Sequence, residues 1–158
     1  MPIGAYSEKH IMPENKLVPV PDEVSDEVAS CVTLKGITAE YLLHRAYPLK
    51  KGDKVLYHAA AGALGQILCP WANSIGAEII GTVGSKEKEE IAKKNGCHHV
   101  INYTDKNFVE EVEKIVGKNG IDVVYDGVGL KTFEGSIEVL KIRGMMIAFG
   151  NASGYVDT

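Results

Sequence analysis

Residues 54–83 decide the fold of this chain: they read Lys54-Val-Leu-Tyr-His-Ala59, then Ala60-Ala-Gly62-Ala-Leu-Gly65, and, after a helical run, Glu78-Ile-Ile-Gly-Thr-Val83. The first and third segments are rich in apolar and β-branched residues, which is typical of buried strands. The second is punctuated by glycines and leads into a helix that Gly76 is expected to end. The order strand, glycine turn, helix, strand predicts a βαβ unit.

The glycine turn has a spacing that brings backbone close to a phosphate group. Gly62 would let a pyrophosphate approach the main chain, and Gly65 would permit tight packing of the helix on the strand. The helix N-terminus would direct its free N–H groups at the phosphates. Ala60 stands where the first glycine of the pattern G-x-G-x-x-G is usual, so a glycine turn without a ligand stays an alternative on this segment alone.

Length and composition indicate a single globular domain. The 158 residues suffice for one core but not for a cofactor domain plus a full substrate domain. The net charge of −4, without a basic stripe, argues against a nucleic-acid partner. No apolar run reaches the ~20 residues of a membrane-spanning helix, and the N-terminal segment lacks the pattern of a signal peptide. We therefore expect a cytoplasmic protein with no membrane partner.

The segment before the first parallel strand is predicted to hold short strands and two helices. Residues 5–20 alternate loosely and are rich in proline, which favours one or two short strands on an irregular edge. Ser25 is the expected N-cap of a helix that Gly36 ends. A second helix is expected over residues 38–47, where Pro48 stops it.

Strands and helices alternate from there to the end of the chain. Five strands joined by helical crossovers specify an α/β fold, a Rossmann-type doubly wound parallel sheet. A complete dinucleotide-binding sheet has six strands, so we expect the last strand to be missing and both ends to be cut from a larger protein. The later elements are expected as strands over 98–102, 121–125 and 145–149 and helices over 86–95, 107–116 and 132–140.

The residues after the second strand favour NADPH over NADH. In this fold an acid about 20 residues past the glycine turn binds the ribose 2′-hydroxyl of NAD. Here Val83 is followed by Gly84-Ser85-Lys86-Glu87-Lys88, whose hydroxyl and ammonium groups suit a 2′-phosphate. The alternative is that the lysines form only a solvated helix face, although lysines near a helix N-terminus oppose its dipole. Tyr103, just past the third strand, could lie against the adenine or serve only as packing.

The ends of the later strands offer backbone and aromatic surface rather than catalytic side chains. Gly127 has no side chain that would obstruct the end of the fourth strand. The run 149–151, Phe-Gly-Asn, could flank a nicotinamide ring. Asp126 precedes this glycine, and an Asp there is more often a turn residue than a general base. We assign no catalytic side chain and expect the cofactor to perform hydride transfer.

No metal site or hydrolytic site is expected. Cys31, Cys69 and Cys97 lack a C-x-x-C spacing, which fits reduced thiols better than a disulfide framework or a zinc site. His98 and His99 are neighbours in a predicted strand and would point to opposite faces, so they cannot readily chelate one ion. No serine-histidine-acid order and no H-E-x-x-H motif occurs.

Seven motifs, in one order along nearly the whole chain, resemble the NADPH-dependent quinone oxidoreductases. That family is the zinc-free, zeta-crystallin-like branch of the medium-chain dehydrogenase/reductase superfamily. The motifs are Leu34-Lys-Gly-Ile-Thr38-Ala, Tyr47-Pro-Leu-Lys-Lys-Gly-Asp53, His58-Ala-Ala-Ala-Gly62-Ala-Leu-Gly65-Gln, Gly81-Thr-Val-Gly-Ser85, Val100-Ile-Asn-Tyr103, Val124-Tyr-Asp-Gly-Val-Gly129 and Phe149-Gly-Asn-Ala-Ser-Gly154.

The resemblance implies a division of the chain and a set of cofactor-binding residues. Residues 1–20 would be a remnant of a GroES-like catalytic domain, and residues 21–158 would form the NADPH-binding Rossmann domain. By motif, the nicotinamide would lie near Thr38, Phe149, Gly150 and Asn151, the pyrophosphate near Ala61, Gly62, Ala63 and Leu64, and the adenosine phosphate near Gly84, Ser85, Lys88 and Tyr103.

The implied activity is hydride transfer from NADPH to a quinone or a similar electrophile. Members of the family are commonly dimers whose cofactor sheets meet edge to edge, so we expect a homodimer through residues 145–149 or through the N-terminal strands. Two alternatives stay open: a stand-alone NADPH-binding module without turnover, and another zinc-free reductase such as an enoyl reductase.

Four positions depart from the family pattern, two of them in the glycine turn. The family usually has Gly-Gly-Val-Gly where this chain has Gly62-Ala-Leu-Gly65, and serine where Gly127 stands. It usually has glutamine at Pro70, and a proline inside a helix costs about 3 kcal/mol if nothing compensates for the lost hydrogen bond.

Overall fold

The computed structural model describes residue 4 and residues 6–156. The chain divides into two compact units, residues 1–33 and residues 34–158. Residues 1–3, 5, 157 and 158, which the predicted domain ranges include, lie outside the described residues. The assignment of residues 1–20 to a GroES-like domain stays a prediction.

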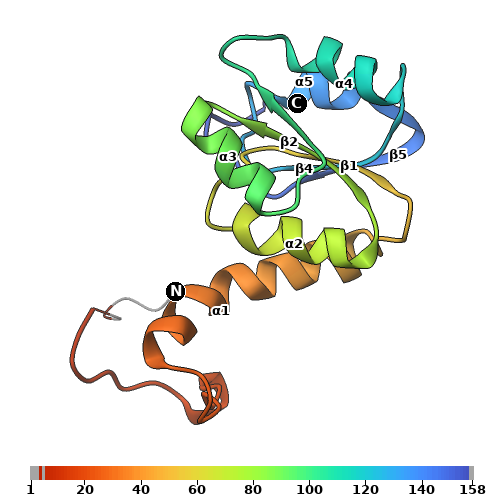
Figure 1. The fold of residues 1–158 in the computed structure, drawn as a ribbon. Helices are drawn as coiled ribbons and strands as arrows, with labels where there is room; N and C mark the ends of the chain where they lie inside the picture. The colour runs from red at the N-terminus through yellow and green to blue at the C-terminus, as the bar shows by residue number, and fades with distance from the viewer. Residues whose placement is uncertain (1–3, 5, 157–158) are drawn as a thin grey trace. The chain divides into compact units, whose positions relative to one another are not determined.

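The second unit is built on a five-stranded sheet with the order β3-β2-β1-β4-β5 (Figure 1). All its strand pairs are parallel. The chain places β2 and β3 on one side of β1 and then crosses over to place β4 and β5 on the other side. The Rossmann-type doubly wound fold is therefore confirmed. The strands are β1 (Lys54–Tyr57), β2 (Glu78–Val83), β3 (His99–Asn102), β4 (Ile121–Asp126) and β5 (Leu140–Ala148).

Helices cover both faces of this sheet. They are α2 (Gly65–Ile75), α3 (Lys86–Lys94), α4 (Phe108–Val116) and α5 (Phe133–Glu138). Figure 1 shows α4 and α5 together on one face and α2 on the other. Two of the helices have side-chain N-caps, because Ser85 Oγ accepts from the Lys88 N–H at 3.4 Å and Asn107 Oδ1 accepts from the Val109 N–H at 3.0 Å. No helix of the described residues is both long and apolar enough to span a bilayer.

The core has one cluster on each face of the sheet because neighbouring strand residues point in opposite directions. Leu56 of β1 packs in the cluster that contains Val112 of α4. Tyr57, the next residue, packs in the cluster that contains Leu68 of α2 and Tyr125 of β4. Both faces of the central strands are therefore buried, as a parallel sheet requires.

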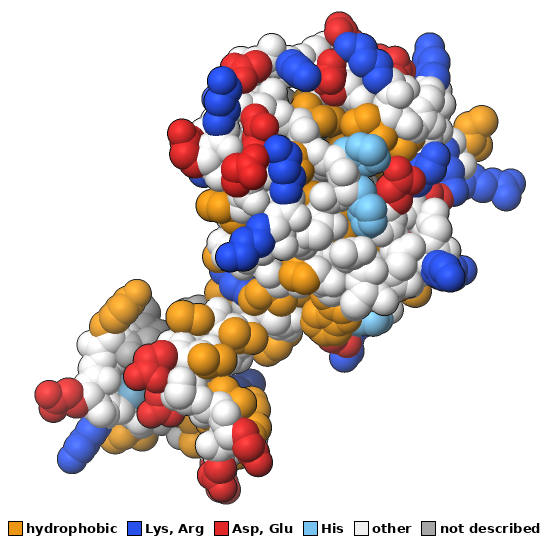
Figure 2. All heavy atoms as spheres, viewed as in Figure 1, with side chains coloured by type: hydrophobic (Ala, Val, Ile, Leu, Met, Phe, Trp, Pro, Cys, Tyr) orange, Lys and Arg blue, Asp and Glu red, His pale blue; other side chains and the backbone are white. Residues whose placement is uncertain are grey.

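The first unit contains no strand in residues 6–33, so the predicted edge strands over 5–20 are wrong for the part that is described. Within residues 6–25, the 3-10 turn η1 (Glu14–Lys16) is the only regular element. Prolines remove backbone donors along this stretch, and no neighbouring strand pairs with it. Val18 is consequently 79% exposed, and Figure 2 shows hydrophobic side chains on the surface of this unit.

The two helices predicted on either side of Gly36 are a single helix, α1 (Asp26–Glu40), which continues as the π-helical turn η2 (Tyr41–Ala46). Ser25 begins it as predicted, since its Oγ accepts from the Val28 N–H at 3.4 Å. A glycine in a helix interior costs only about 1 kcal/mol. Burial of Leu42 and Leu43 in the core stabilises the continuation past the glycine.

The C-terminal elements also shift from their predicted bounds. Strand β5 begins at Leu140 instead of residue 145, and it contains Arg143 with a positive φ of 69°. The pairing with β4 is irregular between Ile121 and Val123. An irregular strand of this kind lacks the strict alternation from which a strand is predicted, and helix α5 therefore ends at Glu138.

Pro70 lies inside α2 without ending it. It removes the N–H that would bond to the carbonyl of Gln66, four residues earlier. Both residues are exposed, so water can solvate the carbonyl that lacks its helical donor. The proline is thus accommodated on the solvent side of the helix.

His58, at the end of β1, is buried with 1% of its surface exposed. Its ring nitrogens contact two hydroxyl groups: Nδ1 lies 2.9 Å from Thr82 Oγ1, and Nε2 lies 2.9 Å from Ser136 Oγ. Burial lowers the pKa of this imidazole from 6.5 to about 4, although the nearby Asp126 carboxylate acts in the opposite direction.

We predict that His58 makes the fold sensitive to acid. Between pH 6.5 and about 4 the unfolded chain binds a proton at this position and the folded chain does not, so stability falls as the pH falls. The loss should approach about 3 kcal/mol at the lower end. Urea unfolding at a series of pH values should show a smaller pH dependence in His58→Asn than in the unmutated chain, whereas the control His99→Asn, whose side chain is 41% exposed, should retain the full slope. Identical slopes for all three proteins would contradict the prediction.

Candidate functional site

The glycine turn after β1 is compact and backbone-lined. Ala59 has a positive φ of 60°, and the Ala60 N–H donates to the carbonyl of Thr82 at 3.0 Å. A Cβ on Gly65 would lie 2.2 Å from the carbonyl oxygen of Ala60, whereas one on Gly62 would lie 3.1 Å from that of Ala59. Gly65 is therefore required for the packing of α2 against the turn, as predicted.

Beside this turn lies a cavity of about 100 Å³ that three distant segments form together. The turn, the residues after β2 and the residue after β3 all contribute, because the carboxyl ends of parallel strands meet at one edge of the sheet. The cavity contains most of the residues predicted for the adenosine phosphate and part of the predicted pyrophosphate turn. Its lining is Ala59, Ala61, Gly62, Val83, Gly84, Lys88 and Tyr103.

The walls of this small cavity carry one ammonium group and no carboxylate. Lys88 comes from the first turn of α3, and the Tyr103 hydroxyl lies so close to Gly84 that a Cβ on that glycine would be 2.6 Å from its oxygen. Ser85 lies next to Gly84 and caps α3, but it does not line the cavity itself. Glu87 is fully exposed, and hydrogen bonding to Ser85 and to backbone lowers its pKa.

A second cavity, of about 710 Å³, adjoins the first and shares Ala59 and Tyr103 with it. It contains two lysines that the sequence-based reasoning missed, although both follow the ends of strands that face this edge. Apolar groups from Phe108 and Val128 form part of its wall. The full lining is Ala59, Tyr103, Lys106, Asn107, Phe108, Val128, Lys131, Thr132, Ala152 and Ser153.

Asp126 organises the loop after β4 and is fully buried. Its carboxylate accepts from the N–H groups of Val128 and Gly129 at 2.7 and 3.0 Å and from the Thr132 hydroxyl at 2.7 Å. It is thus a turn residue, as predicted. Thr132, where the following helix was predicted to begin, does not cap that helix with its side chain, because its hydroxyl donates to Asp126 and to the carbonyl of Gly129.

The predicted nicotinamide residues assemble next to this loop. A Cβ on Gly127 would lie 2.9 Å from the Phe149 ring, and one on Gly150 would lie 2.7 Å from the carbonyl of Gly127. The Phe149 ring stacks on Tyr57 with ring centroids 6.5 Å apart. Asn151 is exposed at the end of the same segment.

Eight predicted residues line neither cavity, and four of them are the nicotinamide residues Gly127, Phe149, Gly150 and Asn151 described above. Ala63 and Leu64 belong to the glycine turn, between the cavity wall and α2. Ser85 borders the small cavity through Gly84. Thr38 lies in α1, where its hydroxyl donates to the carbonyl of Leu34 at 2.7 Å.

The candidate metal ligands make separate contacts. His98 Nδ1 accepts from the Ile79 N–H at 3.1 Å, and His99 Nε2 lies 3.3 Å from a carboxylate oxygen of Glu78. Cys69 and Cys97 are buried free thiols, and the hydrogen bond to Cys97, together with burial, raises the pKa of Cys69. Across residue 4 and residues 6–156, no group of three or more His, Cys, Asp or Glu could hold a metal ion.

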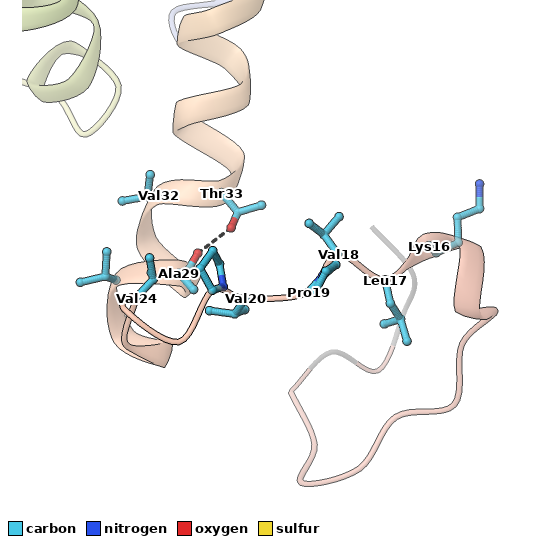
Figure 3. A pocket seen from close by; sticks show the side chains of 11 residues that line it. Lys16, Leu17, Val18, Pro19, Val20, Val24, Ala29, Val32 and Thr33 are labelled. Atoms are coloured by element: carbon cyan, nitrogen blue, oxygen red, sulfur yellow. Dashed lines mark hydrogen bonds between the residues drawn. The ribbon is translucent and has the colours of Figure 1, made fainter.

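The first unit contains a groove of about 500 Å³ lined largely by aliphatic side chains (Figure 3). Val18, Val20, Val24 and Val32 contribute to it, and the Thr33 hydroxyl donates to the carbonyl of Ala29 at 2.6 Å. Lys16 is the single charged residue of its lining. Such a surface offers no reactive group.

Comparison with known proteins connects this geometry to a family of redox enzymes. Residues 63–157 match the family model described as zinc-binding dehydrogenase. A 2-haloacrylate reductase of Burkholderia sp is 49% identical over 158 residues, covering 99% of this chain and 47% of that protein. A quinone oxidoreductase of Pseudomonas aeruginosa is 44% identical over 155 residues, covering 98% of this chain and 48% of that protein.

A solved structure shares both sequence and fold. The quinone oxidoreductase of Escherichia coli complexed with NADPH is 44% identical and has a TM-score of 0.86, covering 89% of this chain and 43% of that chain. The chain thus spans about half the length of the curated relatives that it matches.

We predict that Gly65→Ala destabilises the fold by roughly 1–3 kcal/mol, because the added methyl group would collide with backbone that cannot move aside. Gly62→Ala is the matched control in the same turn, since its methyl group would need only a small shift of the Ala59 carbonyl. Urea unfolding measures both. A Gly65→Ala variant as stable as Gly62→Ala would show that α2 is not held against the turn in this way.

Proposed function

Because this chain belongs to the zinc-binding dehydrogenase family, we propose that it forms the NADPH-binding domain of a quinone oxidoreductase, a protein that transfers hydride from NADPH to a quinone or a similar electrophile. The observation that carries the proposal is the small cavity in which Lys88 and the Tyr103 hydroxyl meet beside the glycine turn. Its size suits a phosphate group, and its lining has no carboxylate to repel one.

The 2′-phosphate of NADPH is the natural occupant of that cavity. Lys88 supplies a charge-assisted hydrogen bond, Tyr103 supplies a hydroxyl donor, and Ser85 adds a second hydroxyl at the rim. A ribose 2′-hydroxyl, as in NADH, would find no acidic acceptor in this lining. The backbone of Ala61, Gly62, Ala63 and Leu64 would then receive the pyrophosphate.

The nicotinamide end would lie against the segment that contains Phe149, Gly150 and Asn151, where Gly127 leaves space for the Phe149 ring. Thr38 is the proposed neighbour on α1. When bound, the reduced nicotinamide supplies the hydride, so the task of these residues is to hold and orient it. The buried Asp126 shapes the loop beneath and needs no role as a base.

Zinc has no part in this proposal. The family description refers to zinc, but the donor set of the described residues offers no group of three ligands. No step is therefore assigned to a metal ion.

A second substrate class deserves a direct comparison with quinones, since the Burkholderia relative is a 2-haloacrylate reductase. Both substrates accept hydride at an electron-poor carbon or oxygen of a conjugated system, so one cofactor domain can serve either. Oxidation of NADPH by 1,4-benzoquinone and by 2-chloroacrylate would separate the two. Tight binding of NADPH without turnover would instead favour a stand-alone binding module, and turnover of enoyl thioesters an enoyl reductase.

The cofactor preference gives the central test. We predict that the unmutated chain binds NADPH more tightly than NADH by ~1.5–3 kcal/mol, as expected for charge-assisted hydrogen bonds to a phosphate. Lys88→Ala should remove most of that difference, whereas Lys94→Ala, at the far end of the same helix, should leave it unchanged. Fluorescence titration with both nucleotides measures it. Equal affinities in the unmutated chain would contradict the assignment.

We also propose a cytoplasmic homodimer that binds neither nucleic acid nor membranes. In the described residues β5 pairs only with β4 and forms one border of the sheet. Its side chains Ile142 and Met145 are 91% and 43% exposed. Lys141 and Arg143 charge the first half of this edge, but residues 145–148 carry no charge, and such an edge is a template for pairing with a second copy around a two-fold axis.

We predict that the chain sediments as a dimer at micromolar concentration. Met145→Lys, which places a charge on the uncharged part of the edge, should shift it towards the monomer. Ile91→Lys on the exposed side of α3 is the matched control and should leave the dimer intact. A clean monomer of the unmutated chain would overturn the proposal.

A further inference from the structure

His58 joins three elements of the second unit, β1, β2 and α5, from a buried position with 1% of its surface exposed. Its ring contacts Thr82 of β2 and Ser136 of α5, both at 2.9 Å, and both partners are buried with 1% and 0% exposure. We refer to Thr82, His58 and Ser136 as the imidazole bridge. A neutral imidazole donates from one nitrogen and accepts at the other, and hydroxyl groups can match either arrangement.

The imidazole bridge is better explained by the geometry that it fixes than by the stability that it adds. Three buried polar side chains contribute little net stability compared with apolar groups of the same shape, but losing one partner leaves the others unsatisfied. Such a network therefore fixes the relative positions of the elements that it joins. The elements joined here are β1, β2 and α5.

The Thr82 end of the bridge bears directly on the glycine turn. Ala59, the residue after His58, has a left-handed backbone conformation that a non-glycine residue adopts only under external restraint. The next N–H, of Ala60, donates to the carbonyl of Thr82 at 3.0 Å. The His58 side chain therefore contacts the Thr82 side chain, and the Thr82 main chain binds the turn. Together these two contacts keep the turn in place.

The Ser136 end bears on the wall of the larger cavity. The Phe108 ring meets the His58 ring edge-on, with centroids 5.1 Å apart and an interplanar angle of 84°. On its other side, Phe108 lies over α5, where a Cβ on Gly135 would be 2.5 Å from the ring. Phe108 lines the larger cavity, and Ala59 lines both cavities.

We propose that His58 is a positioning residue for the dinucleotide, which sets the Ala59–Gly62 turn and the Phe108 wall without touching the ligand itself. The inference rests on the proposed function and adds to it a residue that lines neither cavity. His58 would affect binding through the main chain of the Ala59–Gly62 turn, which the pyrophosphate of either nucleotide would contact. It should therefore act equally on NADPH and NADH, unlike Lys88, which would act on the 2′-phosphate alone.

Three substitutions separate positioning from a general effect on stability. His58→Leu removes both hydrogen bonds. His58→Asn places an amide near the position of Nδ1 and can retain the contact with Thr82, whereas His58→Gln reaches towards Ser136 in place of Nε2. His99→Asn is the control on the exposed end of β3, where the side chain pairs only with Glu78.

Titration of each full-length variant with NADPH and with NADH, beside urea unfolding, tests the proposal. We expect His58→Leu to weaken both nucleotides at least about tenfold with an unchanged ratio between them, as the loss of a buried hydrogen-bonded pair implies. Since the turn depends on Thr82, His58→Asn should restore both affinities to within about threefold, and His58→Gln should not. The control should match the unmutated chain.

The outcomes are distinguishable. If the unmutated chain binds neither nucleotide, the proposed function and this inference both fail. If it binds NADPH and folded His58→Leu binds as tightly, only the inference fails. If His58→Leu does not fold, the other two variants decide: affinities that follow the free energy of unfolding, and not the contact retained, would overturn the positioning role.

Discussion

The contact between Gly65 and the carbonyl of Ala60 is the constraint on which the site depends. Because no side chain separates them, α2 can begin directly against the end of β1. The glycine turn is thereby held where the ends of β2 and β3 also arrive. Lys88 and Tyr103 follow those two strands, so a sheet order of β3-β2-β1 is enough to bring residues about 40 positions apart to one cavity.

Most of the fold was predictable because its signals are local. Each buried strand of the sheet's centre is a short apolar run, and Ser85, Asn107 and Gly76 mark helix ends by chemistry that operates within a few residues. The wrong predictions concern elements whose form depends on distant contacts. Gly36 ends no helix since α1 continues into the buried Leu42 and Leu43, and the N-terminal segment has no strand to pair with.

The candidate site was predictable in part for a related reason. Residues that adjoin a strand end, such as Gly84, Lys88 and Tyr103, could be placed together by the rule that parallel strands end at one edge. Lys106 and Lys131 were not predicted as site residues, because each lies several residues beyond the end of its strand, in a loop whose path the sequence does not specify. The partners of His58 lie 24 and 78 residues away, and nothing in their types or spacing indicates a shared contact.

Pro70 has a consequence for how the turn moves. The carbonyl of Gln66 has no helical donor, so the first turn of α2 is joined to the rest of the helix by one main-chain bond fewer than in an uninterrupted helix. Opening of that first turn would therefore break one main-chain bond fewer than in an uninterrupted helix, while the burial of Leu64 and Gly65 opposes it. A ligand that bridges the turn would add to that burial in keeping the turn closed.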